Sequence, residues 1–157
     1  MSKKYPLLSF IWPAILMMVI FAFSACPAET SDEQSGLLVN TITSIFPGIT
    51  DIKLITTIVR KTAHFLEYAL LGFLFARAYS KNVGFARGDK KMILLAAIAS
   101  ALYSTTDEIH QVFVPGRSCE FTDILLDTIG ASVGASIYFL ICKKRTQKDK
   151  KAQETSL

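Results

Sequence analysis

Seven ionisable residues that could do chemistry lie within or at the ends of long apolar runs. They form three groups along the chain: His64 with Glu67, Asp107 with Glu108 and His110, and Asp123 with Asp127. Ionisable side chains are costly to bury in a membrane, and where they occur there they are candidates for a functional site. We therefore expect the three groups to meet in one site.

The spacing along the chain places three of the carboxylates at a common depth. Fourteen or sixteen residues separate each from the basic residue at the far end of its run: Glu67 from Lys81, Asp107 from Lys91 and Asp127 from Lys143. At the ~1.5 Å rise per residue of an α-helix, these separations amount to roughly 21–24 Å. The sequence therefore predicts a layer of carboxylates near one end of a helix bundle.

The polar residues also share helix faces, because positions three or four apart lie on one side of a helix. The stripes on the last three runs are His64, Glu67, Tyr68 and Leu71; Ser100, Ser104, Asp107 and Gln111; and Asp127, Gly130, Ala131 and Gly134. Small residues four apart favour close approach of a neighbouring helix in a membrane. We therefore expect another helix to pack tightly against Gly130 and Gly134.

A short polar link between the third and fourth runs carries a cation. Pro115 and Gly116 predict a turn. Arg117 follows, and its planar guanidinium suits bidentate binding of phosphate or carboxylate. Two roles stay open for it, a clamp on an anionic ligand or an internal salt bridge with Asp107 or Glu108.

Several kinds of chemistry fit these residue types. Glu67 or His64 could act as a general base. His64, Glu67 and His110, together with the aspartates, could ligate a divalent metal such as Zn²⁺, Mn²⁺ or Mg²⁺, although the HxxE spacing is common by chance. The candidate nucleophiles are Ser104 and Tyr68. The cluster could instead be a polar network that holds the helices together.

The elements that position these residues are four apolar runs, at about residues 7–25, 62–79, 92–106 and 124–142. Since 51% of the chain is hydrophobic, we predict an all-α fold, a polytopic membrane helix bundle with four transmembrane helices. A capping box at residues 31–34 predicts a short amphipathic helix on the outer surface, ended by Pro47 and Gly48. Residues 1–142 form one domain and residues 143–157 a basic tail.

The first run is longer than the apolar part of a signal peptide, so we expect a retained helix. The alternative is cleavage at residues 23–26, Phe-Ser-Ala-Cys, which resembles a lipoprotein box.

The basic residues set the orientation. They concentrate before the first run, between the second and third runs, and after the fourth. Because positive residues stay on the cytoplasmic side, both termini are predicted to be cytoplasmic and the carboxylate layer to face outward. The net charge of +4 does not indicate nucleic-acid binding, because aromatic residues are not interleaved with the basic ones. The expected partner is membrane lipid.

Two blocks, RKTAHFLEYALLGFLFARAY and DEIHQVFVPGRSCEFTDILLDTIGASVG, resemble the VanZ-like family, and the similarity spans about residues 20 to 140. Cys26 departs from the family pattern, in which Gln is usual. The resemblance assigns functional importance to a set of residues: Lys61, His64, Glu67, Tyr68, Asp107, Glu108, His110, Gln111, Pro115, Gly116, Arg117, Asp123 and Asp127.

The resemblance also implies a multi-pass protein of the cell envelope linked to low-level resistance to glycopeptides such as teicoplanin. It does not supply a biochemical activity. We expect an outward-facing pocket that binds or acts on a lipid-linked or lipoglycopeptide amphiphile. Its candidate catalytic residues are His64, Glu67, Asp107, Glu108, His110 and Asp127, and its candidate substrate-binding residues are Lys61, Tyr68, Gln111, Arg117 and Asp123. The alternatives are a scaffold held by a polar packing network, or a small transporter.

Overall fold

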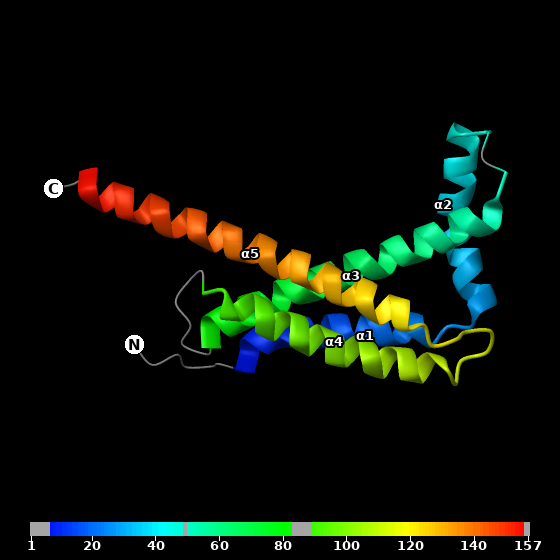
Figure 1. Cartoon of the computed structure of the whole chain (residues 1–157), viewed down its shortest axis with the longest axis horizontal. Coiled ribbons are helices and arrows are strands. Elements are labelled where there is room, and N and C mark those ends of the chain that lie inside the picture. The colour runs from blue at the N-terminus through cyan, green and yellow to red at the C-terminus, as the bar shows by residue number, and fades with distance from the viewer. Residues whose placement is uncertain (1–6, 49, 83–88, 156–157) are drawn as a thin grey trace.

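The computed structural model of the chain describes residues 7–48, 50–82 and 89–155, and helices dominate it (Figure 1). In chain order they are η1 Leu7–Phe10, α1 Ile11–Ser24, α2 Ala28–Ile45, α3 Ile52–Asn82, α4 Lys91–Gln111 and α5 Phe121–Thr155. The all-α prediction is confirmed. Three of the basic residues that set the predicted orientation, Lys3 and Lys4 before the first run and Arg87 between the second and third runs, lie outside the described residues.

Four of the helices form a bundle in which successive members run in opposite directions (Figure 1). α3 packs against both α4 and α5, and α1 lies along α3 and α4. α2 leaves the bundle at a steep angle, at the end where the link between α4 and α5 also lies. The bend between the first helix and α2 measures 108°. α2 and the link between α4 and α5 therefore lie at the same end of the bundle.

Many large apolar side chains of the bundle point outward, around a small buried apolar core. On α4, Leu94, Ile98 and Leu102 are exposed by 60%, 47% and 68%, whereas Ser100 and Ser104 on the opposite face are fully buried. A continuous exposed apolar face of this kind marks contact with a partner or a membrane. The arrangement supports the predicted membrane helix bundle.

Fewer helices pass a composition test for membrane spans than the four predicted from the apolar runs. Two helices, α4 and α5, are long and apolar enough to cross a membrane, and a third span is added if the bent pair Leu8–Ser24 and Ala28–Ile45 is counted as one. α3 is 31 residues long but is not among them. His64, Glu67 and Arg77 reduce its apolar character, so four crossings do not follow from composition.

α3 begins ten residues earlier than the second apolar run predicted, at Ile52 instead of Thr62. A carboxylate oxygen of Asp51 accepts a hydrogen bond from the backbone N–H of Leu54 at 3.0 Å, which caps the first turn. The extension carries Arg60 and Lys61 on the same rigid helix as the carboxylate layer.

The predicted capping box at residues 31–34 was wrong. α2 starts at Ala28, and Pro27 occupies the cap position without a side-chain hydrogen bond. Proline is well tolerated at a helix start, because a backbone N–H at that position would have no partner within the helix. Ser31 is therefore inside the helix, where it faces the bundle. The predicted end before Pro47 and Gly48 agrees with the last helical residue, Ile45.

The basic tail continues α5 as a helix as far as Thr155. After Gly134 the chain has no further glycine or proline, and its Lys, Gln, Glu and Ala residues are good helix formers.

The stripe of small residues on α5 lies against α3, as the sequence predicted for some neighbouring helix. A Cβ atom added to Gly134 would overlap the carbonyl oxygen of Ala69, and one added to Gly130 would lie 2.6 Å from the carbonyl oxygen of Phe65. Gly72 of α3 approaches α5 as closely from the other side. This contact fixes the height of α3 relative to α5, and therefore the height of His64 and Glu67.

Candidate functional site

The link between α4 and α5 bends back over the end of α1. Pro115 and Gly116 occupy the middle of a turn, closed by a 3.2 Å hydrogen bond from the Arg117 N–H to the Val114 carbonyl. Gly116 has a φ of +75°, which L side chains rarely adopt. The Ala28 N–H donates to the Pro115 carbonyl at 3.2 Å. The predicted turn is confirmed, and it holds Arg117 beside the junction of α1 and α2.

Arg117 binds the end of α1 in a way that the sequence did not predict. Its Nε donates to the Cys26 carbonyl at 2.9 Å and its Nη2 to the Phe23 carbonyl at 3.4 Å. A cation at a helix C-terminus satisfies carbonyls that have no partner within the helix. Within the part of the chain that the structure describes, Arg117 forms no ion pair with Asp107 or Glu108.

Asp107 joins α4 to α1. Its side chain is buried, and Oδ2 accepts a hydrogen bond from the Ser24 hydroxyl at 2.6 Å. The Gln111 amide lies 3.5 Å from the same oxygen. The other carboxylate oxygen, Oδ1, has no hydrogen-bond partner among the described residues.

Asp127 joins α5 to α4 in the same way. Oδ2 of this buried carboxylate accepts a hydrogen bond from the Ser104 hydroxyl at 2.7 Å. Nδ1 of His64, on α3, lies 3.9 Å from Oδ1, too far for a hydrogen bond. Two buried aspartates therefore make serine contacts between helices, and each keeps one oxygen free.

Lys61 and Asp123, both predicted to bind substrate, bind one another across α3 and α5. Lys61 Nζ also lies 3.1 Å from a carboxylate oxygen of Glu120 in the link. The hydrogen bond from Lys61 and its positive charge lower the pKa of Glu120. These contacts hold the start of α5 against α3 and occupy the Lys61 ammonium.

A cavity of about 220 Å³ lies between α1, α2, α3 and the link. Its polar lining comes from seven side chains: Ser24, Ser31, Ser35, Arg60, His64, Glu67 and Arg117. Its apolar lining comes from five: Ile20, Phe23, Leu38, Val59 and Ala63. Three of the residues predicted to form the site, His64, Glu67 and Arg117, thus meet at one cavity.

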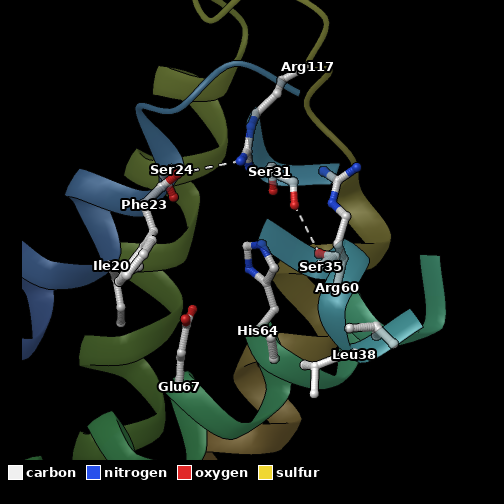
Figure 2. A pocket seen from close by; sticks show the side chains of 12 residues that line it. Ile20, Phe23, Ser24, Ser31, Ser35, Leu38, Arg60, His64, Glu67 and Arg117 are labelled. Atoms are coloured by element: carbon white, nitrogen blue, oxygen red, sulfur yellow. Dashed lines mark hydrogen bonds between the residues drawn. The ribbon is translucent and has the colours of Figure 1, made fainter. Parts of the chain in front are cut away.

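The charges are separated across this cavity. Figure 2 shows the His64 imidazole between the Glu67 carboxylate on one side and the guanidinium groups of Arg60 and Arg117 on the other. Arg60 lies 3.7 Å from Asp32 of α2, in a pair that is partly exposed. Glu67 makes no hydrogen bond or ion pair with any residue that the structure describes. Its carboxylate is near enough to Asp107 to be repelled by it. Of the three carboxylates in the layer, Glu67 is the one that lines this cavity.

Three further predicted residues lie away from the cavity. Oε2 of Glu108 accepts a hydrogen bond from the Glu120 N–H at 2.9 Å. The His110 ring packs 4.4 Å from the Phe21 ring, and the buried Tyr68 ring lies 6.1 Å from that of Tyr103 (centroid to centroid in both cases). Each holds structural elements together.

The residues described do not gather into a metal site. No three His, Cys, Asp or Glu side chains between residues 7 and 155, outside the gaps at 49 and 83–88, come together in a way that could hold an ion. A divalent metal stays an untested alternative for this cluster.

Sequence reasoning missed two contributors to the site. Ser24 was part of a possible cleavage box, but it is buried and holds Asp107. A serine close to the end of an apolar run is the signal that could have found it. Arg60 was not among the predicted site residues, because the second run was expected to start at residue 62 and the earlier start of α3, which carries Arg60 to the cavity, was not predicted.

The family model described as VanZ/LLP1 matches residues 9–142. The chain belongs to the VanZ/LLP1 family. The match ends where α5 leaves the bundle and covers every residue of the cavity. No curated protein and no solved structure matches the chain. Membership of the VanZ/LLP1 family, together with the outward apolar faces of α4 and α5, makes this a membrane protein of the VanZ type.

Proposed function

We propose that this chain is a multi-pass protein of the bacterial cell membrane whose cavity binds an anionic group in the headgroup of an amphiphile in the outer leaflet. Such binding would change the membrane surface and lower susceptibility to glycopeptides such as teicoplanin. The observation that carries the proposal is the cavity itself, in which Arg60 and Arg117 converge above an apolar lining. Guanidinium groups suit phosphate and carboxylate, and apolar walls suit the adjoining hydrocarbon.

Four crossings with both termini in the cytoplasm are part of this proposal. α1, α3, α4 and α5 run alternately along the bundle, and the described ends that carry basic residues, the end of α3, the start of α4 and the tail of α5, lie away from α2 (Figure 1). Reporter fusions after residues 35, 85, 115 and 150 should read outside, inside, outside and inside. An external reporter after residue 85 would contradict it.

The retained first helix is also part of the proposal. Ser24 donates to the buried Asp107, so removal of residues 1–25 would leave a buried carboxylate without its partner. Mass spectrometry of the mature protein should find the first helix intact. A lipid-modified Cys26 at the N-terminus would overturn this.

A scaffold is the second candidate function. It is favoured by the two buried serine–aspartate contacts, Ser24 with Asp107 and Ser104 with Asp127, which join helices directly. In a scaffold, the cavity charges would be dispensable.

Susceptibility to teicoplanin separates these functions. Expressed in a susceptible Gram-positive host, the wild-type chain should raise the inhibitory concentration of teicoplanin, and Arg60→Gln should abolish the increase at equal membrane abundance. The matched control is Arg145→Gln, which removes the same group from the exposed tail of α5. If Arg60→Gln retains the full phenotype, the binding function is wrong and the scaffold is favoured.

A further inference from the structure

The cavity is lined by side chains of both charges, and the positive and negative groups lie on opposite sides. Arg60 and Arg117 lie on one side and Glu67 on the other, with His64 between them (Figure 2). An anionic ligand alone would use the guanidinium side and would bring its negative charge towards an unpaired carboxylate. The separation of charge is therefore informative about the ligand.

Glu67 is not used by the protein itself. Its carboxylate lines the cavity and has no hydrogen-bond or ion-pair partner among the described residues, although Asp107 is close enough to repel it. Placing a carboxylate in a low-dielectric environment costs free energy unless a cation or a hydrogen-bond donor binds it. The hydroxyl of Ser24, which α1 contributes to the cavity lining, already donates to Asp107.

The size of the cavity restricts what can enter. Its volume of about 220 Å³ is below the roughly 300–1,000 Å³ of sites for drug-sized ligands. A whole glycopeptide does not fit, but a lipid headgroup does. Leu38 is 59% exposed at the edge of the cavity and offers an apolar path for the attached hydrocarbon.

We propose that the cavity binds a zwitterionic phospholipid headgroup, with its phosphate at Arg60 and Arg117 and its primary ammonium at Glu67. This rests on the proposed function and adds to it the second charge of the ligand. An aminoalkyl phosphate such as phosphoethanolamine carries both groups at short range. It satisfies Glu67 with a charge-assisted hydrogen bond, which an anionic headgroup lacking an amine cannot do.

Lipid retention measured by native mass spectrometry tests the proposal on the full chain, purified in a neutral maltoside detergent. The probes are dioleoyl phosphatidylethanolamine and dioleoyl phosphatidylglycerol, which share a phosphate and differ in the amine. The wild-type protein should retain phosphatidylethanolamine about tenfold more strongly, as expected for one charge-assisted hydrogen bond. Equal or weaker retention of phosphatidylethanolamine would overturn the proposal without the need for any variant.

A pair of variants locates the preference. Glu67→Gln should remove the preference for phosphatidylethanolamine and leave phosphatidylglycerol binding unchanged, whereas Glu33→Gln, an exposed residue of α2, should alter neither. A preference that survives in Glu67→Gln would place the ammonium elsewhere and contradict the proposal. If Glu67→Gln does not fold, Glu67→Asp should keep the preference, and its loss there would count against it.

The outcomes also separate this inference from the proposed function. If both lipids bind equally and Arg60→Gln weakens both, the cavity takes an anionic headgroup and only the zwitterion is wrong. If neither lipid depends on Arg60, the proposed function fails as well. Free phosphoethanolamine, added as a competitor, distinguishes a soluble from a lipid source. Displacement of lipid at equal concentration would show that the acyl chains contribute nothing and overturn the lipid assignment.

Discussion

Replacing Gly134 by alanine tests the close contact of α3 with α5, on which the position of His64 and Glu67 depends. The added Cβ would overlap the carbonyl oxygen of Ala69. Since that oxygen belongs to the backbone of α3, no side-chain rotation can relieve the overlap, and the two helices must move apart.

The expected loss follows from two opposing effects. Overpacking of a close interface costs about 1–3 kcal/mol, and here the upper part of that range applies because the clash is with backbone. Alanine in place of glycine gains about 1 kcal/mol of helix propensity. We therefore expect Gly134→Ala to lower the free energy of unfolding by about 2 kcal/mol.

The control is the same substitution at Gly36 of α2, where a Cβ meets nothing within 4 Å. Gly36→Ala keeps only the gain in propensity and should stabilise the protein by up to about 1 kcal/mol. Unfolding by sodium dodecyl sulfate in maltoside micelles, followed by circular dichroism, gives both values. If Gly134→Ala stabilises the protein as much as Gly36→Ala does, the close contact of α3 with α5 is wrong.

Three further perturbations test the contacts around the site. Ser104→Ala removes the donor to buried Asp127 and should cost about 1–3 kcal/mol in the same unfolding assay; an unchanged value would contradict the contact. The lowered pKa of Glu120 gives stability that is present above its unfolded pKa and lost as pH falls through the folded pKa. The melting temperature of Lys61→Met should therefore fall less than that of the wild type between about pH 5 and pH 3. An equal fall in both proteins would count against the contact of Lys61 with Glu120. Arg117→Ala should increase proteolysis at the junction of α1 and α2, and Arg117→Lys should increase it less. If Arg117→Ala is as resistant to proteolysis as the wild type, the contacts of Arg117 with the carbonyls matter little.

The faces of the helices could be predicted from sequence, because a helix repeats every 3.6 residues whatever surrounds it. Ser100, Ser104, Asp107 and Gln111 were expected on one face, and all four are buried. The close approach at Gly130 followed equally from residue size.

The partners within the site could not be predicted, because they depend on how the helices pack. Arg117 was expected to meet a carboxylate or a ligand, but the 112–120 link places it at the Phe23 and Cys26 carbonyls. Lys61 and Asp123 were both assigned to substrate, yet nothing in either local sequence shows that α3 and α5 bring them together. The start of α3 was missed because the prediction followed the apolar run, whereas the helix begins at the cap that Asp51 supplies.

A structure of the protein determined in lipid nanodiscs containing phosphatidylethanolamine tests the central claim most directly. The account predicts density for a lipid phosphate within hydrogen-bond distance of both Arg60 and Arg117, with the hydrocarbon leaving past Leu38. A cavity that holds only water, while ordered lipids are visible along the outer faces of α4 and α5, would contradict it.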